Sequence, residues 1–232
     1  MTANPKAWMS WSSGKDSAMA LHVVRSGGDV EVTALLSTVN AAADRVAMHA
    51  VRRSLLEAQA NRLGLPLVVV EIPSPCTNEV YEARMGDAMT VALGEGVEHV
   101  VFGDLFLADV REYRESRLAG TVIFPLFPLW GRPTGALARE MIGSGLQAVL
   151  TCVDPVQLCG DFVGRRFDAE LLADLPEGVD ACGEHGEFHT FAWDARDFVR
   201  RSTSRSERSS NEMASFSVTW SQADGNPVLH PV

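Results

Sequence analysis

The sequence AWMSWSSGKDS at residues 7–17 decides the fold of this chain. Its apolar start, residues 7–11, predicts a short buried strand, and residues 18–25 predict a helix that ends at Gly27 and Gly28. The first turn of a helix has backbone N–H groups without internal partners, and the helix dipole favours an anion there. The small residues between strand and helix therefore predict a phosphate site.

Lys15 lies in this turn, although the chain has only two lysines among its 20 basic residues. An ammonium group is a compact point charge, whereas the planar guanidinium of arginine is bulkier. Ser12, Ser13 and Gly14 allow a large anion to approach the backbone, and the two hydroxyls supply further donors. The alternative interpretation is a helix capped by serine with an incidental lysine.

The turn differs from a Walker A loop, which needs glycine five residues before the Gly-Lys pair and Ser or Thr directly after the lysine. Met9 and Asp16 occupy these positions. Residues 12–17 instead resemble the pyrophosphate-binding loop (PP-loop), usually Ser-Gly-Gly-x-Asp-Ser, of the N-type ATP pyrophosphatases. Those enzymes split ATP into AMP and pyrophosphate. Ser13 replaces the first glycine of that loop, a change that is tolerated if the backbone angle at Ser13 is not left-handed.

Strands and helices alternate in the first half of the chain. Apolar runs predict strands at 30–39, 67–72 and 99–103, and helical periodicity predicts helices at 48–62 and 80–93. This alternation implies a parallel sheet with right-handed crossovers, and hence an α/β fold. Ligands of such sheets bind beyond the carboxyl ends of the strands.

Three strand ends are therefore expected to share one cleft: residues 12–17, 37–40 and 103–104. Ser37 and Thr38 either lie beside the adenine or form a polar turn after the strand. Gly103 permits close approach of a ligand, and Asp104 offers a carboxylate for Mg²⁺ or a substrate amine. The alternative for Asp104 is a cap on the next helix. His49, near the start of the helix at 48–62, is either structural or close to the nucleotide and substrate.

The second half begins with a densely charged helix around residues 109–115. Arg111 and Glu115 are four residues apart and are expected to meet on one face, which is either a solvated surface or a substrate contact. Residues 124–131, FPLFPLWG, are predicted to be neither a helix nor an inner strand because of their two prolines. We interpret them as the crossover into a second, smaller domain. That domain has predicted helices at 137–142 and 167–175, the latter capped by Asp168, and a strand at 147–153.

Residues 180–190, DACGEHGEFHT, hold two glycines, two glutamates and two histidines. His185 and His189 have the spacing that binds zinc on a helix, but the glycines argue against a helix. We expect a polar loop in which four side chains face the nucleotide cleft: Glu184, Glu187, His189 and Thr190. Such groups orient an amine, accept its proton or hold a metal. A hydrogen-bonded turn is the alternative.

The loop at 12–17, the strand end at 103–104, the crossover at 124–131 and the Gly183-Glu184-x-Gly186-Glu187-Phe188-His189-Thr190 motif together resemble the diphthine–ammonia ligase family. The sequence is most similar to the bacterial branch of that family, and the resemblance covers residues 6–198. It implies an adenine nucleotide alpha hydrolase-like (Rossmann-like) domain at 1–120 and a smaller α+β substrate domain at 121–198, with the active cleft between them. Residues 199–232 are expected to form a flexible or atypical tail.

The resemblance also implies chemistry. ATP adenylates a carboxylate, ammonia attacks the acyl-adenylate, and an amide, AMP and pyrophosphate are released. Residues 12–17 would hold the phosphates, with Lys15 stabilising pyrophosphate, and Asp16 or Asp104 would bind Mg²⁺. Glu184, Glu187 and His189 would face the acceptor. The expected substrate contacts are His49, Arg111, Glu115 and Thr190.

Alternatives and departures accompany this resemblance. The chain is otherwise interpreted as an ATP-binding or sensing protein without efficient ligase chemistry, or as another adenylating enzyme. His185 stands where many relatives have asparagine, and Arg114 does not align with the second arginine of the eukaryotic helix. The natural acceptor of a bacterial relative would be another carboxylate, such as a small metabolite. The family is also the basis for expecting a homodimer.

Composition argues against three other classes of protein: nucleic-acid-binding, membrane-spanning and exported. The formal charge of −10 argues against a broad nucleic-acid surface, and no stretch approaches the roughly 20 apolar residues that cross a bilayer. The N-terminus lacks a charged region followed by a long apolar one. The four cysteines show no C-x-x-C pairing, so reduced thiols are expected. We therefore expect a cytoplasmic enzyme.

Overall fold

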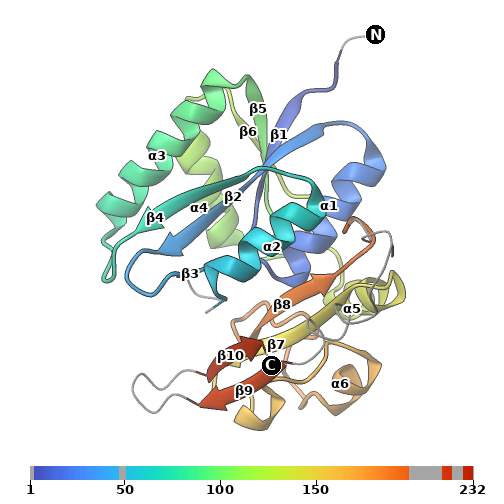
Figure 1. Cartoon of the computed structure of the whole chain (residues 1–232). Coiled ribbons are helices and arrows are strands. Elements are labelled where there is room, and N and C mark those ends of the chain that lie inside the picture. The colour runs from blue at the N-terminus through green and yellow to red at the C-terminus, as the bar shows by residue number, and fades with distance from the viewer. Residues whose placement is uncertain (1–2, 47–50, 199–215, 221–226, 232) are drawn as a thin grey trace, which may run out of the picture.

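A parallel sheet forms the centre of the first half of the chain. The computed structural model describes residues 3–46, 51–198, 216–220 and 227–231 (Figure 1). Five strands pair in parallel in the order β4-β2-β1-β5-β6. Their bounds are β1 Lys6–Ser10, β2 Glu31–Asn40, β4 Leu67–Ile72, β5 Val97–Val101 and β6 Phe124–Leu126. The two-residue strand β3, Arg45–Val46, pairs antiparallel with the end of β2. The structure thus confirms the α/β class.

Helices cover both faces of this sheet, and the pleat of the strands divides the core accordingly. Ala7 and Met9 of β1 pack with α1 (Lys15–Gly27) and α2 (Arg53–Leu63), whereas Trp8 packs with α3 (Asn78–Gly94) and α4 (Ala108–Leu118). Successive side chains of a strand point to opposite faces, so this division follows from sequence order alone. The connections leave β1 and β5 in opposite directions, which makes their carboxyl ends the topological switch point.

The second half of the chain packs against the α1 and α2 face. Its elements are α5 Thr134–Gly143, β7 Gln147–Val153, the 3₁₀ turn η1 Gly160–Phe162, α6 Ala169–Asp174 and β8 Phe188–Asp194. The strands β7 and β8 form an antiparallel pair, and Leu137, Leu150 and Phe188 join the same buried cluster as α1 and α2. The hydrophobic core therefore runs without a break from the first half into the second (Figure 1).

Most predicted elements are present, with shifts at their ends. The helix expected at 18–25 begins already at Lys15 and ends, as expected, at Gly28, which adopts the left-handed conformation. Gly64 ends α2 in the same conformation. The predicted cap of α6 is confirmed, since Asp168 Oδ1 accepts the N–H of Leu171 at 2.9 Å. The helix expected from residue 48 begins only at Arg53, because Val51 closes a turn by accepting the N–H of Val46.

Two further differences concern the crossover and the tail. Residues 124–126 are not only a crossover, because they form β6 at the edge of the sheet, where Pro125 is tolerated without donating to a further strand. The segment expected as a tail contains β9, Phe216–Trp220, and β10, Pro227–Pro231, which pair antiparallel. Backbone contacts place β10 beside β7.

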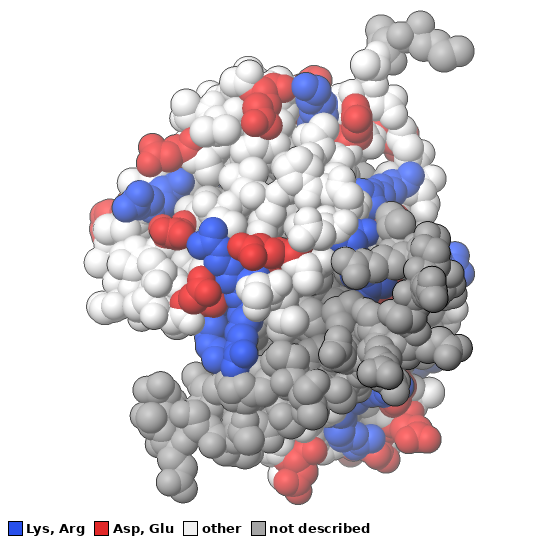
Figure 2. All heavy atoms as spheres, viewed as in Figure 1, with Lys and Arg blue, Asp and Glu red and all other residues white. Residues whose placement is uncertain are grey.

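The described surface is mixed in charge. Figure 2 shows acidic and basic side chains interspersed over the described part of one face, without a broad basic area there. Within the described ranges, no helix combines the length and apolar character that a membrane span needs. All four cysteines are free thiols, and Cys182 is buried.

Candidate active site

The loops after β1 and β5 touch at the switch point. A Cβ on Gly103 would lie 3.0 Å from the carbonyl carbon of Asp16 and 3.1 Å from the nitrogen of Ser17. Glycine at 103 therefore lets the end of β5 pack closely against the first turn of α1, and any side chain there would push the two backbones apart. This contact brings two of the three predicted strand ends together, residues 12–17 and 103–104.

The loop at 12–17 is closed by its own hydroxyls. Ser12 Oγ accepts the N–H of Gly14 at 3.3 Å and donates to Ser17 Oγ at 3.2 Å, while Ser17 Oγ donates to the carbonyl of Gly14 at 3.0 Å. The N-cap of α1 is Gly14, which has no side-chain cap hydrogen bond. The interpretation as a serine-capped helix is therefore wrong, and the first turn of α1 remains directed at the loop.

Ser13 is the unusual residue of this loop. Its φ angle is +69°, in the left-handed region, which costs a residue other than glycine about 1–2 kcal/mol. The condition for replacing glycine without strain, a backbone angle outside that region, is thus not met. Ser13 is completely buried, and its Oγ has no hydrogen-bond partner among the described residues. The loop accordingly stores strain that other contacts must offset.

Lys15 is turned toward the second half of the chain. Its side chain is 2% exposed, and its Nζ lies 2.9 Å from Asp16 Oδ2 and donates to the carbonyl of Cys182. The rings of Phe167 and Phe188 lie 5.5 and 5.3 Å from this nitrogen. Burial lowers the pKa of Lys15, but the Asp16 carboxylate and its hydrogen bond outweigh burial, so the net pKa is raised. The ammonium therefore stays charged inside the protein.

The strand β8 covers the loop. Thr190 Oγ1 accepts the N–H of Lys15 at 3.1 Å, and a Cβ on Gly14 would come within 3.1 Å of the carbonyl oxygen of Thr190. The N–H of Ala192 donates to the carbonyl of Ser13 at 2.9 Å. Thr190, a predicted site residue, thus contacts the loop directly.

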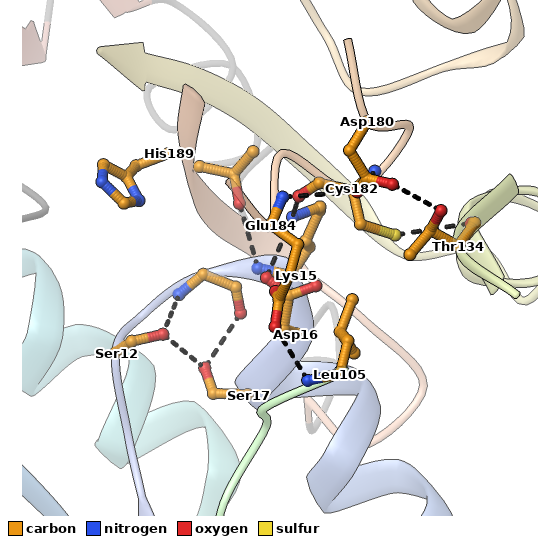
Figure 3. Close-up of polar contacts among 12 residues, drawn as sticks. Ser12, Lys15, Asp16, Ser17, Leu105, Thr134, Asp180, Cys182, Glu184 and His189 are labelled. Atoms are coloured by element: carbon orange, nitrogen blue, oxygen red, sulfur yellow. Dashed lines mark hydrogen bonds and ion pairs between the residues drawn. The ribbon is translucent and has the colours of Figure 1, made fainter. Parts of the chain in front are cut away.

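Glu184, in the loop that precedes β8, lies near Lys15 and Asp16 of the loop at 12–17. Its Oε1 accepts the N–H of Leu105 at 2.9 Å, so the side chain also joins the end of β5 (Figure 3). Burial, followed by the nearby Asp16 carboxylate, raises the pKa of Glu184 to about 7, although the Leu105 N–H and Lys15 oppose this shift. Glu184 can therefore exchange a proton near neutral pH.

Two other predicted residues of the 180–190 loop are placed differently. Glu187 is 1% exposed, and its two carboxylate oxygens accept the N–H groups of Asp180 at 2.8 Å and His185 at 2.9 Å. Its carboxylate holds the loop together and does not line the cleft. The ring of His189 points away from Lys15 and Asp16 (Figure 3). Burial, followed by the Lys15 charge, lowers the pKa of His189.

The charged residues near β5 and α4 pair with each other. Asp104 makes a bidentate ion pair with Arg114, at 2.5 Å to Nε and 3.1 Å to Nη2, and does not cap α4, whose N-cap is Leu107. The predicted contact of Arg111 with Glu115 is confirmed at 2.7 Å. The guanidinium of Arg111 also lies 4.8 Å from each of two ring centroids, those of Phe127 and Trp130.

The remaining expected nucleotide contacts are less direct. Ser37 is 2% exposed and donates its hydroxyl to the carbonyl of Trp11, so it joins the ends of β2 and β1. Thr38 is half-buried on the same strand end. His49 lies outside the described residues.

Gln59 of α2 was missed in the sequence. It is 2% exposed and hydrogen-bonds to Trp11 and Ser13, at the loop of residues 12–17, and to Ala192 of β8. The available signal was its position, because Gln59 lies between Leu56 and Leu63 on the apolar face of the helix. A polar residue on such a face needs a buried partner.

The donors present fit a magnesium ion only in part. Asp16 Oδ1 is buried without a hydrogen-bond partner among the described residues, which suits a cation ligand, whereas the Asp104 carboxylate is taken by Arg114. Among the residues that the structure describes, no group of three or more His, Cys, Asp or Glu side chains could hold a metal ion. Mg²⁺ at nucleotide sites commonly uses one or two carboxylates together with phosphate oxygens and water.

Comparison with known proteins identifies the family of this chain. The family model for the diphthamide synthase N-terminal domain matches residues 5–119, and that for the diphthamide synthase C-terminal domain matches residues 133–220. Diphthine–ammonia ligase of Danio rerio is 32% identical over 211 residues, which cover 82% of each chain. The human and rat proteins of that name are 30% and 29% identical over 162 residues, 63% of this chain and 60% of theirs. With both halves matched in order, the chain belongs to the diphthine–ammonia ligase family.

Proposed function

We propose that this chain is an ATP-dependent ligase that activates a carboxylate as an acyl-adenylate and transfers ammonia to it. AMP and pyrophosphate are the other products. The observation that carries the proposal is the meeting of the loop at 12–17 with Glu184, an ionisable carboxyl whose pKa lies at about 7. Relatives named diphthine–ammonia ligase support the reaction class.

The loop at 12–17 is the proposed site of the ATP phosphates. It comes after β1 at the switch point and precedes the first turn of α1, where backbone N–H groups and the helix dipole favour an anion. Ser12 is half-exposed, whereas Ser13 and Ser17 are buried, so the hydroxyl of Ser12 is the one that a phosphate reaches most directly. In this proposal its O–H exchanges Ser17 Oγ for a phosphate oxygen. Asp16 would hold Mg²⁺, which when bound neutralises phosphate charge.

Lys15 acts in this proposal through the neighbouring carboxylate. Its ammonium contacts Asp16 Oδ2 and lies too deep to meet a ligand at the surface of the cleft in this conformation. It fixes Asp16 and adds positive potential beside the leaving pyrophosphate. Arg111 and Glu115, with Thr190, remain the proposed contacts of the acceptor.

Glu184 is the proposed general base. Ammonia attacks the carbonyl carbon of the acyl-adenylate, the new C–N bond forms, and the C–O bond to AMP breaks. The proton lost from nitrogen passes to the Glu184 carboxylate, which is half-buried and near neutral pKa, as a general base requires. The acceptor is a carboxylate whose identity is left open.

A second candidate is a nucleotide-binding protein of the same fold without efficient ligase chemistry. The buried position of Lys15 and the engagement of Asp104 by Arg114 favour it, because two groups suited to phosphate and metal are already paired.

One labelling experiment separates the two. The protein is incubated with α-labelled ATP, Mg²⁺, ammonium and a pool of candidate carboxylates, and the nucleotide products are resolved. AMP that forms only when a carboxylate is present supports the ligase. ADP as the sole product contradicts it, and nucleotide binding without any turnover favours the second candidate.

A further inference from the structure

Gln59 connects three segments that are distant in sequence. Its Oε1 accepts the indole N–H of Trp11 at 2.8 Å, and its Nε2 donates to the carbonyls of Ser13 at 3.0 Å and Ala192 at 2.6 Å. Trp11 lies between β1 and the loop at 12–17, Ser13 lies within that loop, and Ala192 belongs to β8. One side-chain amide therefore connects α2 both to the loop at 12–17 and to β8.

The position requires an amide. Both N–H donors of Gln59 are used by carbonyls and its oxygen is used by an N–H group, so the buried group is matched on every side. A methionine of similar volume would fill the space but leave the Trp11 indole and the Ala192 carbonyl without this partner. A glutamate would still accept from Trp11 but would place its oxygen against two carbonyl oxygens.

The bond to Ser13 controls the direction of a peptide plane. The carbonyl of Ser13 and the N–H of Gly14 belong to the same planar peptide unit and point in opposite directions. Gln59 Nε2 of α2 and the N–H of Ala192 of β8 both donate to this carbonyl, so the N–H of Gly14 is turned the other way, to Ser12 Oγ. Ser13 adopts the left-handed conformation that this plane demands, in spite of its side chain.

We propose that Gln59 is a positioning residue for the nucleotide loop. Its amide holds Ser13 in the left-handed conformation and thereby keeps the Gly14 N–H on Ser12 Oγ, which fixes the position of the Ser12 hydroxyl at the proposed phosphate site. This inference rests on the proposed ATP site. Because the chain has serine where glycine would adopt the same angle without strain, its loop depends on Gln59 more than a glycine loop would.

Titration calorimetry with ATP and Mg²⁺ tests this dependence. Gln59→Met is expected to raise the Kd for ATP about tenfold, the change that one lost hydrogen-bonding contact typically produces. Adding Ser13→Gly to Gln59→Met is expected to restore most of the affinity, since glycine adopts the left-handed angle unaided. Leu63→Ala is the matched control on the same helix, because it removes core volume without touching the loop.

The outcomes are distinguishable. Equal rises in Kd for Gln59→Met and Leu63→Ala, or no rescue by Ser13→Gly, would overturn the positioning role. Absence of ATP binding by the unmodified protein would instead remove the proposed function. If Gln59→Met does not fold, NMR of the unmodified protein replaces it and monitors the Gln59 amide and Trp11 indole protons. Signals that stay fixed as ATP is added also overturn the proposal.

Discussion

The loop at 12–17 and the loop at 180–187 are held in different ways. The loop at 12–17 has hydroxyl hydrogen bonds of its own but also depends on distant partners, namely Gln59, Thr190 and Ala192. The loop at 180–187 is held largely by its own carboxylates, because Asp180 and Glu187 accept backbone N–H groups from within it. The first loop therefore reaches its conformation only in the complete fold, whereas the second is determined mainly by its local sequence.

Glu187→Ala is expected to break the self-supported loop and to have the largest effect on stability. It removes a buried carboxylate that accepts the N–H groups of Asp180 and His185, which lowers the free energy of unfolding by about 3 kcal/mol. Denaturation by urea measures this loss. The control is Glu184→Gln in the same loop, expected within about 1 kcal/mol of the unmodified protein. Equal losses for both variants would show that Glu187 does not hold the loop.

Glu184→Gln is expected to reduce the rate of the proposed reaction while changing stability little. Removal of a general base lowers the rate of AMP formation on the order of 100-fold. In the unmodified protein this rate rises with pH through about 7, the pKa of Glu184, because only the carboxylate accepts a proton. The glutamine variant loses this rise. His185→Asn, at an exposed neighbour, is the control, and an unchanged pH profile in Glu184→Gln would exclude Glu184 as the base.

The raised pKa of Glu184 also predicts how stability changes with pH. The change is opposite in direction to that of a carboxyl whose pKa is lowered on folding. Since the folded pKa of Glu184 is raised, the folded state holds its proton more tightly than the unfolded state. Stability falls as pH rises from about 4.5 to about 7 and then levels off. Urea denaturation across this range is expected to show a smaller fall for Glu184→Gln.

Lys15→Met tests the link between the two loops. It removes the ammonium that joins Asp16 to the Cys182 carbonyl, and the expected loss of stability is about 2 kcal/mol, because Asp16 is partly exposed. The other lysine of the chain, Lys6, is exposed and serves as control in Lys6→Met.

The pKa of Lys15 fixes the pH range of that effect. Because its net pKa is raised above 10.5, its stabilising contribution is complete below pH 10.5 and is lost as pH rises further. The difference between Lys15→Met and the unmodified protein is therefore expected to shrink above pH 10.5. A difference that stays constant there would assign the loss to packing alone.

Ser13→Gly is expected to have the smallest effect and to stabilise the protein. Glycine adopts the φ of +69° without strain, and the gain is about 1 kcal/mol after its own entropic cost. Ser12→Gly, which removes hydroxyl hydrogen bonds from a residue outside the left-handed region, is the contrasting variant and is expected to destabilise. Thermal unfolding of both variants provides the measurement.

Periodicity and local capping made a large part of the fold predictable from the sequence. The alternating strands and helices, the parallel sheet and the Asp168 cap each depend on residues that are close in sequence. The edge strand β6 was interpreted as a crossover because its proline hides the strand pattern, although an edge position tolerates proline.

The site could be predicted only as a list of polar residues. Glu184 and Glu187 lie three residues apart and have the same side chain. Only the fold shows that Glu184 accepts from Leu105, after β5, while Glu187 accepts from its own loop. Likewise, no local pattern reveals the left-handed angle of Ser13, because that angle is imposed by Gln59 and Ala192.

The bond between Lys15 and Thr190 has a consequence for synthesis of the chain. It joins residues 175 positions apart, so the loop translated almost first is completed by a strand translated near residue 190. A nascent chain that has left the ribosome only as far as α4 contains the whole loop but none of the segment that covers it. Completion of the proposed nucleotide site is thereby deferred until most of the protein has emerged.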